Sequence, residues 1–528
     1  MNDASIKAAS VRRARDAPRL SLEAIDRLIT AYDDRREILA LRVGRYAAWA
    51  ACRSAVRWRL VSRDLGFNLV GAAAGSRAAA HRHPRLAFGA AAGDITRNAR
   101  ALFRRRLLAL RFYRPVTGPD GRVRDAVYDD LLDPAAWGGE PLILDFDWPG
   151  MPGGGALPTR GQLRAAPYRA LISRTARRLR AEAHIAAVAR ELAARLGNLD
   201  GALPGGLDVE WLANCLRRFE AARRVYGGLL RLLRPSVLLL TNGPGRVGEL
   251  AAARDAEVPA VELQHGTWGP RDAGVHWGDL AARQRDAIPA PDRLLVYGEL
   301  WRAFLVGGAF WRPEQVVAVG AGGVDRYRRL SREKPAEHGA PVRVLFPTQQ
   351  IGVAESIDFW ERFFELARHA PRLSVELVLK LHPLEAADAT PYAALQARWR
   401  DRVRLVGPEI GTLGCILDAD IVAGHHSTCQ MEALALGVPA VSICNATVPN
   451  GLAGMHERRW LEELVPHVRD PESLAALLEN VGRRDTGALA AWTARVREAA
   501  KELYTPGFLQ NARNAIEPLL HDASGRGR

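Results

Sequence analysis

The 528-residue chain has few cysteines, very few lysines and no long apolar run. Its five cysteines are scattered and none forms a Cys-x-x-Cys pair, which excludes a zinc ribbon and a disulfide scaffold. No apolar run approaches the ~20 residues that a membrane-spanning helix needs. The first twenty residues also lack the apolar core of a secretory signal. We therefore expect a cytoplasmic protein with free thiols, which would act on a membrane only from its inner surface.

The rest of the composition is that of a globular protein, with 48% hydrophobic and 25% charged residues. At ~100–200 residues per domain, the length predicts two to four domains. The net charge of +15 is concentrated at one end, since residues 1–115 contain 24 Lys and Arg against 9 Asp and Glu. The sequence thus predicts a basic, mostly helical extension over 1–115 on a neutral body.

Within this extension, residues 40–63 alternate arginines with apolar and aromatic side chains, as in a basic amphipathic helix. Two interpretations remain open. The apolar stripe packs on the body while the arginines are solvated, or the helix lies on an anionic membrane surface. We expect no nucleic-acid partner, because no helix-turn-helix, RNP or zinc-finger pattern accompanies the charge.

Apolar strands alternate with helical segments through the rest of the chain, a pattern typical of parallel βαβ units. The expected strands are 141–147, 236–241, 260–263, 293–297 and 316–319 in a first series, and 342–346, 375–380, 403–406, 420–423 and 440–443 in a second. We therefore predict an α/β fold with two Rossmann-like domains, 116–335 and 336–528, that face a cleft; the second ends in a helical tail. Parallel sheets bind ligands outside the carboxyl ends of their strands.

Two groups of polar residues follow strands of the second sheet. Lys380 and His382, in Lys-Leu-His-Pro, lie two residues apart at a strand end, on one side of the strand. Ser427 and Thr428 precede a helix whose N-terminus favours an anion, and Glu432 lies one turn further. The simpler interpretations are a loop histidine and an ordinary helix cap closed by Glu432.

In the first sheet, Gln264-His265-Gly266 follows one strand and Asn242-Gly243 follows another, so both are expected to border the cleft. His265 suits a general base that takes the proton of an acceptor hydroxyl. A structural histidine at a strand end is as good an interpretation of this motif alone. Glu249, Glu262 and Asp272 are rival bases.

Taken in order over roughly 235–450, these motifs resemble the GT-B glycosyltransferases of bacterial surface, capsule-type polysaccharide biosynthesis. Relatives of that family are the CDP-glycerol glycerophosphotransferases and the bacterial sialyl- and Kdo-transferases. The resemblance implies a nucleotide held mainly by the second domain and no metal or other cofactor. It assigns donor phosphate to His382, Ser427 and Thr428, ribose to Glu432, and the catalytic base to His265. The acidic-acidic-glycine triplet of the sialyltransferases is not evident, which argues against a sialic acid donor.

We therefore expect a metal-independent glycosyltransferase that moves a sugar, or a polyol phosphate, from a nucleotide-activated donor to a glycan or lipid-linked acceptor. Lys380, His382 and the 427–428 helix start would stabilise the departing phosphate, and the basic extension would hold the enzyme near an anionic membrane surface. One alternative is a non-hydrolysing nucleotide-sugar 2-epimerase, which needs no acceptor. Another is a non-catalytic scaffold that docks at a membrane.

Overall fold

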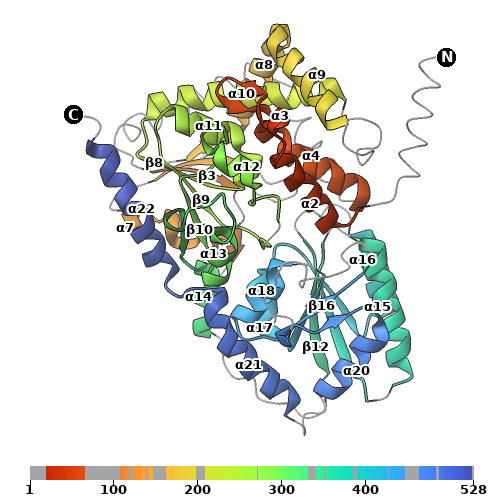
Figure 1. Ribbon diagram of the computed structural model, residues 1–528. Coiled ribbons are helices and arrows are strands. Elements are labelled where there is room, and N and C mark those ends of the chain that lie inside the picture. The colour runs from red at the N-terminus through yellow and green to blue at the C-terminus, as the bar shows by residue number, and fades with distance from the viewer. Residues whose placement is uncertain are drawn as a thin grey trace, which may run out of the picture.

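The computed structural model describes most of the chain (Figure 1). The described residues are 20–65, 107–112, 115–117, 123–137, 141–146, 162–197, 208–269, 272–330, 341–349, 352–370, 372–382, 385, 389–425, 427–445, 463–482 and 487–525. Their two large sheets are both entirely parallel, and each belongs to its own domain.

The first sheet has seven strands in the order β11-β10-β9-β8-β3-β6-β7. Their bounds are β3 Leu107–Phe112, β6 Leu142–Phe146, β7 Gln162–Arg164, β8 Val237–Thr241, β9 Ala260–Leu263, β10 Arg293–Val296 and β11 Val316–Ala318. Helices α8 (Ala165–Arg178), α10 (Val209–Leu233) and α11 (Val247–Asp255) pack on one face, and α22 (Phe508–Gly525) packs on the other. Because both faces are covered, the strands are nearly continuous apolar runs, as in Val-Leu-Leu-Leu of β8.

The second sheet has six strands in the order β14-β13-β12-β15-β16-β17. Its strands are β12 Val342–Pro347, β13 Val375–Lys380, β14 Val403–Val406, β15 Ile421–Gly424, β16 Ala440–Ile443 and β17 His467–Val468. Its helices are α15 Val353–Arg368, α16 Thr390–Arg398, α17 Thr412–Asp418, α18 Thr428–Ala435, α20 Pro471–Gly482 and α21 Ala488–Leu503. The prediction of two Rossmann-like domains is therefore confirmed.

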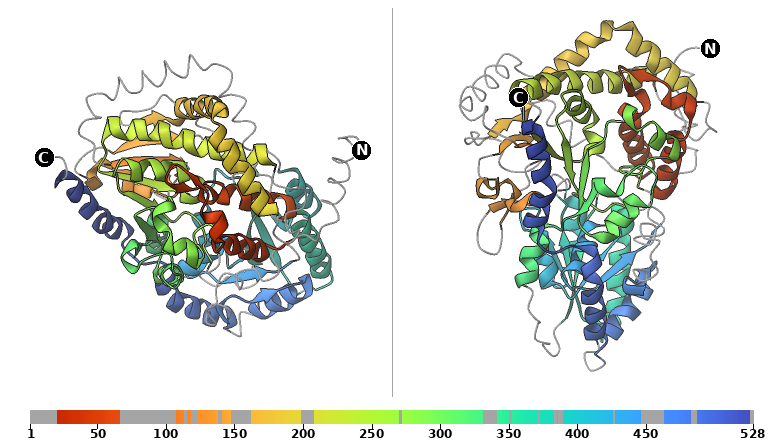
Figure 2. Two further views of the ribbon diagram at one scale, coloured as in Figure 1. Left: turned by 45° about the horizontal axis from the view of Figure 1, so that its top comes forward. Right: turned by 60° about the vertical axis from the view of Figure 1, so that its left-hand side comes forward.

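Two elements lie in a different unit from the one that the sequence assigns to them. β3 falls inside the range of the basic extension, yet it pairs with both β6 and β8 in the middle of the first sheet. Its sequence, Leu-Leu-Ala-Leu-Arg-Phe, has no β-branched residue, so nothing marks it as a strand. Conversely, α22 falls inside the range 336–528, yet it runs back to the first sheet, as both views of Figure 2 show.

The described part of the basic extension is packed into the protein. It comprises α2 (Leu22–Asp33), α3 (Arg36–Leu39), the pair β1 (Arg42–Val43) and β2 (Tyr46–Ala47), and α4 (Ala48–Leu65). The apolar stripe of α4 is buried: Trp49 and Val56 are 0% exposed. This favours packing of the stripe on the body, because a buried stripe is not available to a membrane. The expectation that the arginines are solvated is wrong for Arg53 and Arg57, which are buried in ion pairs with Asp33 and Asp26. The arginine cluster at 104–106 lies outside the described residues.

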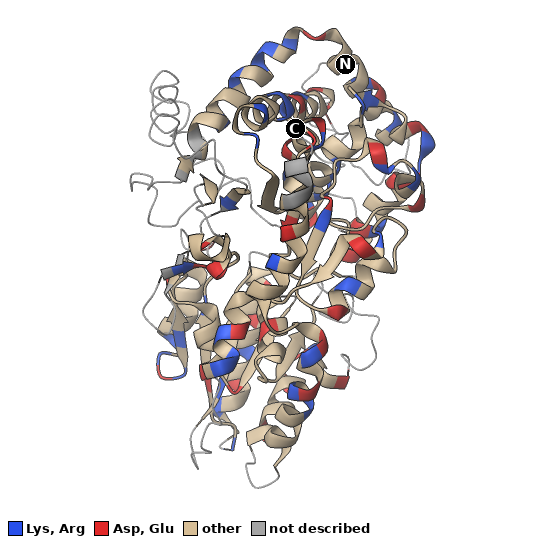
Figure 3. Cartoon of the chain, turned by 90° about the vertical axis from the view of Figure 1, so that its left-hand side faces the viewer, with Lys and Arg blue, Asp and Glu red and all other residues tan. Residues whose placement is uncertain are grey.

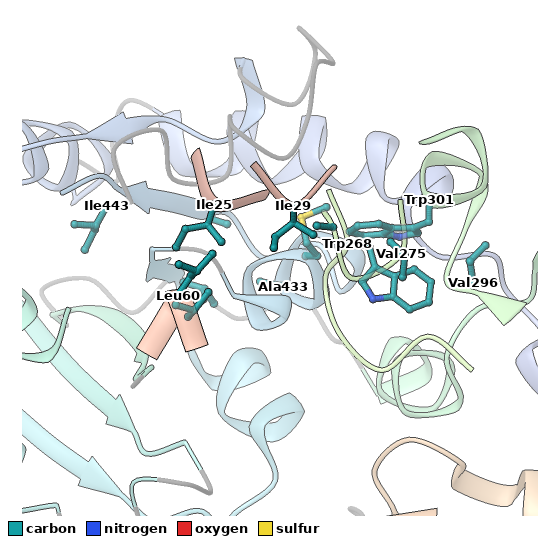
Figure 4. Close-up of a cluster of buried hydrophobic side chains, with 14 of the residues drawn as sticks. Ile25, Ile29, Leu60, Trp268, Val275, Val296, Trp301, Ala433 and Ile443 are labelled. Atoms are coloured by element: carbon teal, nitrogen blue, oxygen red, sulfur yellow. The ribbon is translucent and has the colours of Figure 1, made fainter. Parts of the chain in front are cut away.

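Helices α2 and α4 lie where the two domains meet. Figure 4 shows Ile25 and Ile29 of α2 and Leu60 of α4 between Ile443 of the second domain and Trp268 of the first. All of these side chains belong to one hydrophobic cluster that also contains much of the second sheet. The N-terminal helices therefore complete a core that both domains share.

Charged residues of both signs are interspersed over the described parts of the two domains (Figure 3), as expected for a body that is neutral overall. None of the helices in the described part of the chain has the length and apolar character that a membrane crossing requires.

The buried N-terminal helices make stability a test of their role. We expect Trp49→Ala to lower the free energy of unfolding by about 3–5 kcal/mol, because it empties a fully buried site. Trp58→Ala on the same helix is the matched control, since Trp58 is 36% exposed, and should cost less than about 1 kcal/mol. Urea denaturation followed by circular dichroism measures both, and equal losses would contradict the packing described here.

Candidate functional site

The order of strands in the second sheet places a crevice at its carboxyl edge. The chain starts this sheet at β12 and proceeds outward through β13 and β14 before it crosses to β15 on the other side of β12. Ligands of open α/β sheets bind at such a reversal point, because the loops on its two sides diverge there. Lys380 ends β13, and Ser427 and Thr428 follow β15, so the predicted phosphate-binding residues flank this point.

Lys380 is a buried cation with little compensation. The residue is 4% exposed, and within the described part of the chain its Nζ donates one hydrogen bond, to the carbonyl oxygen of Leu381 at 3.1 Å. Burial lowers the pKa of Lys380, while Cys415, Cys429 and Glu409 act in the opposite direction. A buried ammonium with spare donors is a strong site for an anion, because an anion would restore the interactions that burial removes.

The start of α18 is capped by its own first turn. Ser427 accepts a hydrogen bond from the Cys429 amide at 3.2 Å, and its own amide donates to Oε1 of Gln430 at 2.9 Å. Gln430, rather than Glu432, therefore closes the capping box. The Ser427 hydroxyl is therefore engaged in the cap, whereas the Thr428 hydroxyl takes no part in it.

His382 lies in a turn that a buried glutamate holds. Its amide donates to Oγ1 of Thr348, at 2.9 Å, and more weakly to Oε2 of Glu385, at 3.4 Å. Glu385 is 6% exposed and also accepts hydrogen bonds from the hydroxyls of Thr348 and Tyr392. Burial raises the pKa of Glu385, and these donors oppose the rise. The sequence analysis missed Thr348 and Glu385; the signal for Glu385 was an acid three residues after His382.

On the first domain, Gln264 fixes the turn that carries His265. Its Nε2 donates to the carbonyl oxygen of Gly266 at 2.9 Å, and its Oε1 accepts from the Tyr297 amide at 2.9 Å. Gln264 is 2% exposed; it supports the turn through these hydrogen bonds and also lines a pocket between the domains. His265 itself is partly buried at the carboxyl end of β9.

A direct contact brings the two halves of the predicted site together. Thr267, two residues after His265, donates its amide to Oγ1 of Thr428, at 3.0 Å. The two hydroxyl oxygens, Oγ1 of Thr267 and Oγ1 of Thr428, are 2.9 Å apart. The carboxyl edges of the two sheets therefore face one another, with the His265 turn against the first residue of α18. Thr267 was not predicted, since nothing in the sequence shows which residues of two domains will meet.

Asn242 and Gly243 lie at the reversal point of the first sheet, between β8 and β3. Asn242 has a left-handed backbone with φ of 58°. The Gly243 amide donates to Oε1 of Glu262, at 2.8 Å, and a Cβ at this position would overlap that carboxylate. Gly243 is thus required by close packing, and it borders a small pocket that Glu262 and residues of α4 also line.

The three rival bases each have a partner. Asp272 forms an ion pair with Arg57 at 3.3 Å, and Glu249 faces Arg246 at 3.7 Å. Glu262 is 2% exposed, and burial raises its pKa to about 7 against the opposing effects of the Gly243 amide and Arg246.

Glu432 is a carboxylate without a nearby cation. It lines a pocket between the domains with Gln264, Tyr297 and Gly320, at the carboxyl ends of β9, β10 and β11. Burial alone raises the pKa of Glu432 to about 7. The structure thus places it opposite the His265 turn, which leaves its predicted contact with ribose untested.

His425 has a structural role, since its Nδ1 contacts the Ile443 carbonyl oxygen and its Nε2 contacts the Ser356 hydroxyl, both at 2.8 Å. His426 lies outside the described residues. No group of three or more His, Cys, Asp or Glu side chains in the described part of the chain is arranged to hold a metal ion. Metal independence stays a prediction.

Neither a protein-family model nor a curated protein sequence matches the chain. Similar solved structures include MnaA of S. aureus with UDP, at 10% identity and a TM-score of 0.46, over 79% of this chain and 96% of that chain. A glycosyltransferase from Rickettsia africae follows at 9% and 0.42, over 80% and 99%. HepE from Anabaena with UDP and glucose is similar at 13% and 0.40, over 79% and 99%. At so little identity, we take the fold from the strand order described above.

The raised pKa of Glu262 predicts how the stability of the protein depends on pH. Its folded-state pKa of about 7 exceeds the ordinary value of 4.5, so the folded protein binds more protons than the unfolded chain between these values. Its contribution to stability therefore falls as the pH rises through this window, by up to about 3 kcal/mol. Glu262→Gln should remove this loss, so its thermal midpoint relative to wild type should rise from pH 5 to pH 8. Glu314→Gln, at an exposed position, is the control; parallel profiles for Glu262→Gln and wild type would refute the assignment.

Proposed function

We propose that the chain is a GT-B-like glycosyltransferase that moves a sugar, or a polyol phosphate, from a nucleotide-activated donor to a glycan or lipid-linked acceptor, without a metal ion. The observation that carries this proposal is the contact between Thr267 and Thr428. It sets a histidine-bearing turn of one domain against the start of α18 in the other, where we propose that the donor phosphate binds. A transfer between two substrates requires a proton acceptor and a phosphate site on opposite sides of one reaction centre.

The donor side combines charge and dipole. The Lys380 ammonium is buried at the reversal point of the second sheet, and α18 directs the positive end of its dipole to the same edge. Such a preorganised positive site stabilises the negative charge that develops on a departing nucleotide phosphate. His382 is proposed as a further phosphate ligand, and its turn is held rigidly by Thr348 and Glu385.

The first domain supplies the residue that would take the proton from the acceptor hydroxyl. His265 would take the proton of the acceptor hydroxyl as the new bond from the acceptor oxygen forms and the bond from the donor to its phosphate oxygen breaks. In sugar transfer the nucleotide then leaves as an anion held by Lys380 and α18, and the configuration at the attacked carbon is inverted. In polyol phosphate transfer the acceptor oxygen would attack phosphorus instead, the diphosphate P–O bond would break, and the nucleoside monophosphate would leave to the same site. Any attraction to an anionic membrane would act through the charge of the first 115 residues, since the described apolar stripe is buried.

Nucleotide binding is the first test of the donor site. Calorimetry with CMP, CDP, UDP and GDP should show selective binding of one of them by the wild type. His382→Ala should weaken it by about tenfold or more, since a hydrogen bond to a charged group contributes about 1.5–3 kcal/mol. His369→Ala is the matched control, because His369 is an exposed histidine that follows α15 in the same domain. If the wild type binds none of the four nucleotides, the proposed phosphate site is wrong.

The role of His265 is tested by turnover once the donor is known. His265→Ala should lower acceptor-dependent product formation by about 10²–10⁴-fold while donor affinity stays unchanged, as expected for the loss of a general base. The exposed His184→Ala is the control in the first domain. Unimpaired turnover in His265→Ala would assign the base to another residue, and conversion of the donor without acceptor would indicate an epimerase.

A further inference from the structure

The turn that carries His265 opens a long connection between β9 and α12 (Asp279–Arg283). Its first part is fixed by Gln264 and by the contact with Thr428. Its later part, residues 272–278, lies against the N-terminal helices, which the GT-B-like body itself does not explain. The contacts there show what these helices contribute to the site.

Arg53 of α4 holds this connection through its guanidinium group. Nε and one terminal nitrogen form a two-pronged ion pair with Asp33 of α2, at 2.8 and 2.7 Å. The remaining donors go to the backbone carbonyl oxygens of Ala273 and His276. The guanidinium carbon also lies 4.1 Å from the centre of the Trp277 ring. Arg53 is 3% exposed, so these interactions are shielded from water and are stronger than surface contacts.

Other residues of the same helices bind the same connection. Asp33 accepts a hydrogen bond from the Gly278 amide, at 3.3 Å, and Asp34 accepts one from the amide of Leu280 in the first turn of α12, at 2.9 Å. Arg57 pairs with both Asp26 of α2 and Asp272 of the connection. Two helices thus supply charged groups to one segment of backbone, and Arg53 has the most contacts among them.

The opposite side of these helices rests on the second domain. Ile25, Ile29 and Leu60 lie toward Ile443 at the end of β16 (Figure 4). The helices are therefore in contact with the His265 connection and with the domain that carries α18. They are well placed to fix how the two halves of the site face one another.

We propose that Arg53 is a positioning residue, which holds the 265–280 connection so that His265 faces the start of α18. The expected effect of Arg53 on turnover rests on the proposed function. The statement that Arg53 holds the connection does not depend on it. The proposal also gives the basic N-terminal segment a second role. Its described part would support the acceptor side of the site, in addition to any attraction of the segment to a membrane surface.

Hydrogen–deuterium exchange on the full-length protein tests the structural part. Arg53→Lys keeps a positive charge for Asp33 but cannot reproduce the planar fork and the bonds to both carbonyls. We expect the peptides that cover 265–280 to exchange at least about tenfold faster in this variant, as for a locally released segment. Arg217→Lys is the matched control, since Arg217 is a buried arginine of α10 that pairs with Glu210. Unchanged exchange over 265–280, or an equal increase over the whole chain, would overturn the proposal.

Activity then separates positioning from general stability. Arg53→Lys should lower kcat at least about tenfold, because a misplaced catalytic group costs rate even when binding is intact. Its affinity for the donor nucleotide should stay within about twofold of wild type, since Lys380 and α18 belong to the other domain. A loss of nucleotide affinity equal to the loss of kcat would contradict a positioning role. If the wild type binds no nucleotide at all, the proposed function fails, and the exchange data alone decide whether Arg53 holds the connection.

Discussion

In a parallel sheet all strands end at the same edge, and this constraint determines where chemistry can occur in the molecule. The polar residues that follow β9 and β8 in the first sheet, and β13 and β15 in the second, are gathered at two such edges. Because Thr267 meets Thr428, these edges face one another. A buried lysine and a helix start then lie on one side, with a histidine turn on the other. The proposed reaction follows from this opposition of charge and proton acceptor.

The N-terminal helices show that basic composition and surface exposure are separate properties. Arg53 and Arg57 lie in α4, whose composition suggested an amphipathic surface helix, yet both are buried in pairs with Asp33 and Asp26. Removing one partner of such a pair would leave the other charge buried without compensation, which is destabilising. The two ion pairs therefore oppose separation of α4 from α2. The helices in turn contact both domains. What looked like an addition to the fold is part of its core.

Much of the fold could be predicted from local pattern. The expected strands 260–263, 375–380, 403–406 and 440–443 agree with β9, β13, β14 and β16 residue for residue, because short apolar runs between helices leave little freedom. β3 was missed because it has no β-branched residue. The helical tail was expected, but its packing on the first sheet was not, because contacts between distant parts of the chain have no local signal. The site was predicted at the level of which loops carry it. Individual roles depended on side-chain contacts that the residue pattern does not specify: Gln430 rather than Glu432 closes the cap, and Gln264 supports the turn of His265.

Because α22 packs on the first sheet, the order in which the chain is synthesised determines when one face of that sheet can be covered. Residues of the second domain, from β12 to α21, form one continuous stretch of chain and have their own sheet and helices. The first sheet, by contrast, has one face covered by Phe508, Ala512 and Ile516, which are synthesised after the whole of the second domain. This face of the first sheet therefore stays uncovered while the second domain can already fold. Rapid docking of α22 then matters, since exposed apolar sheet surface favours aggregation.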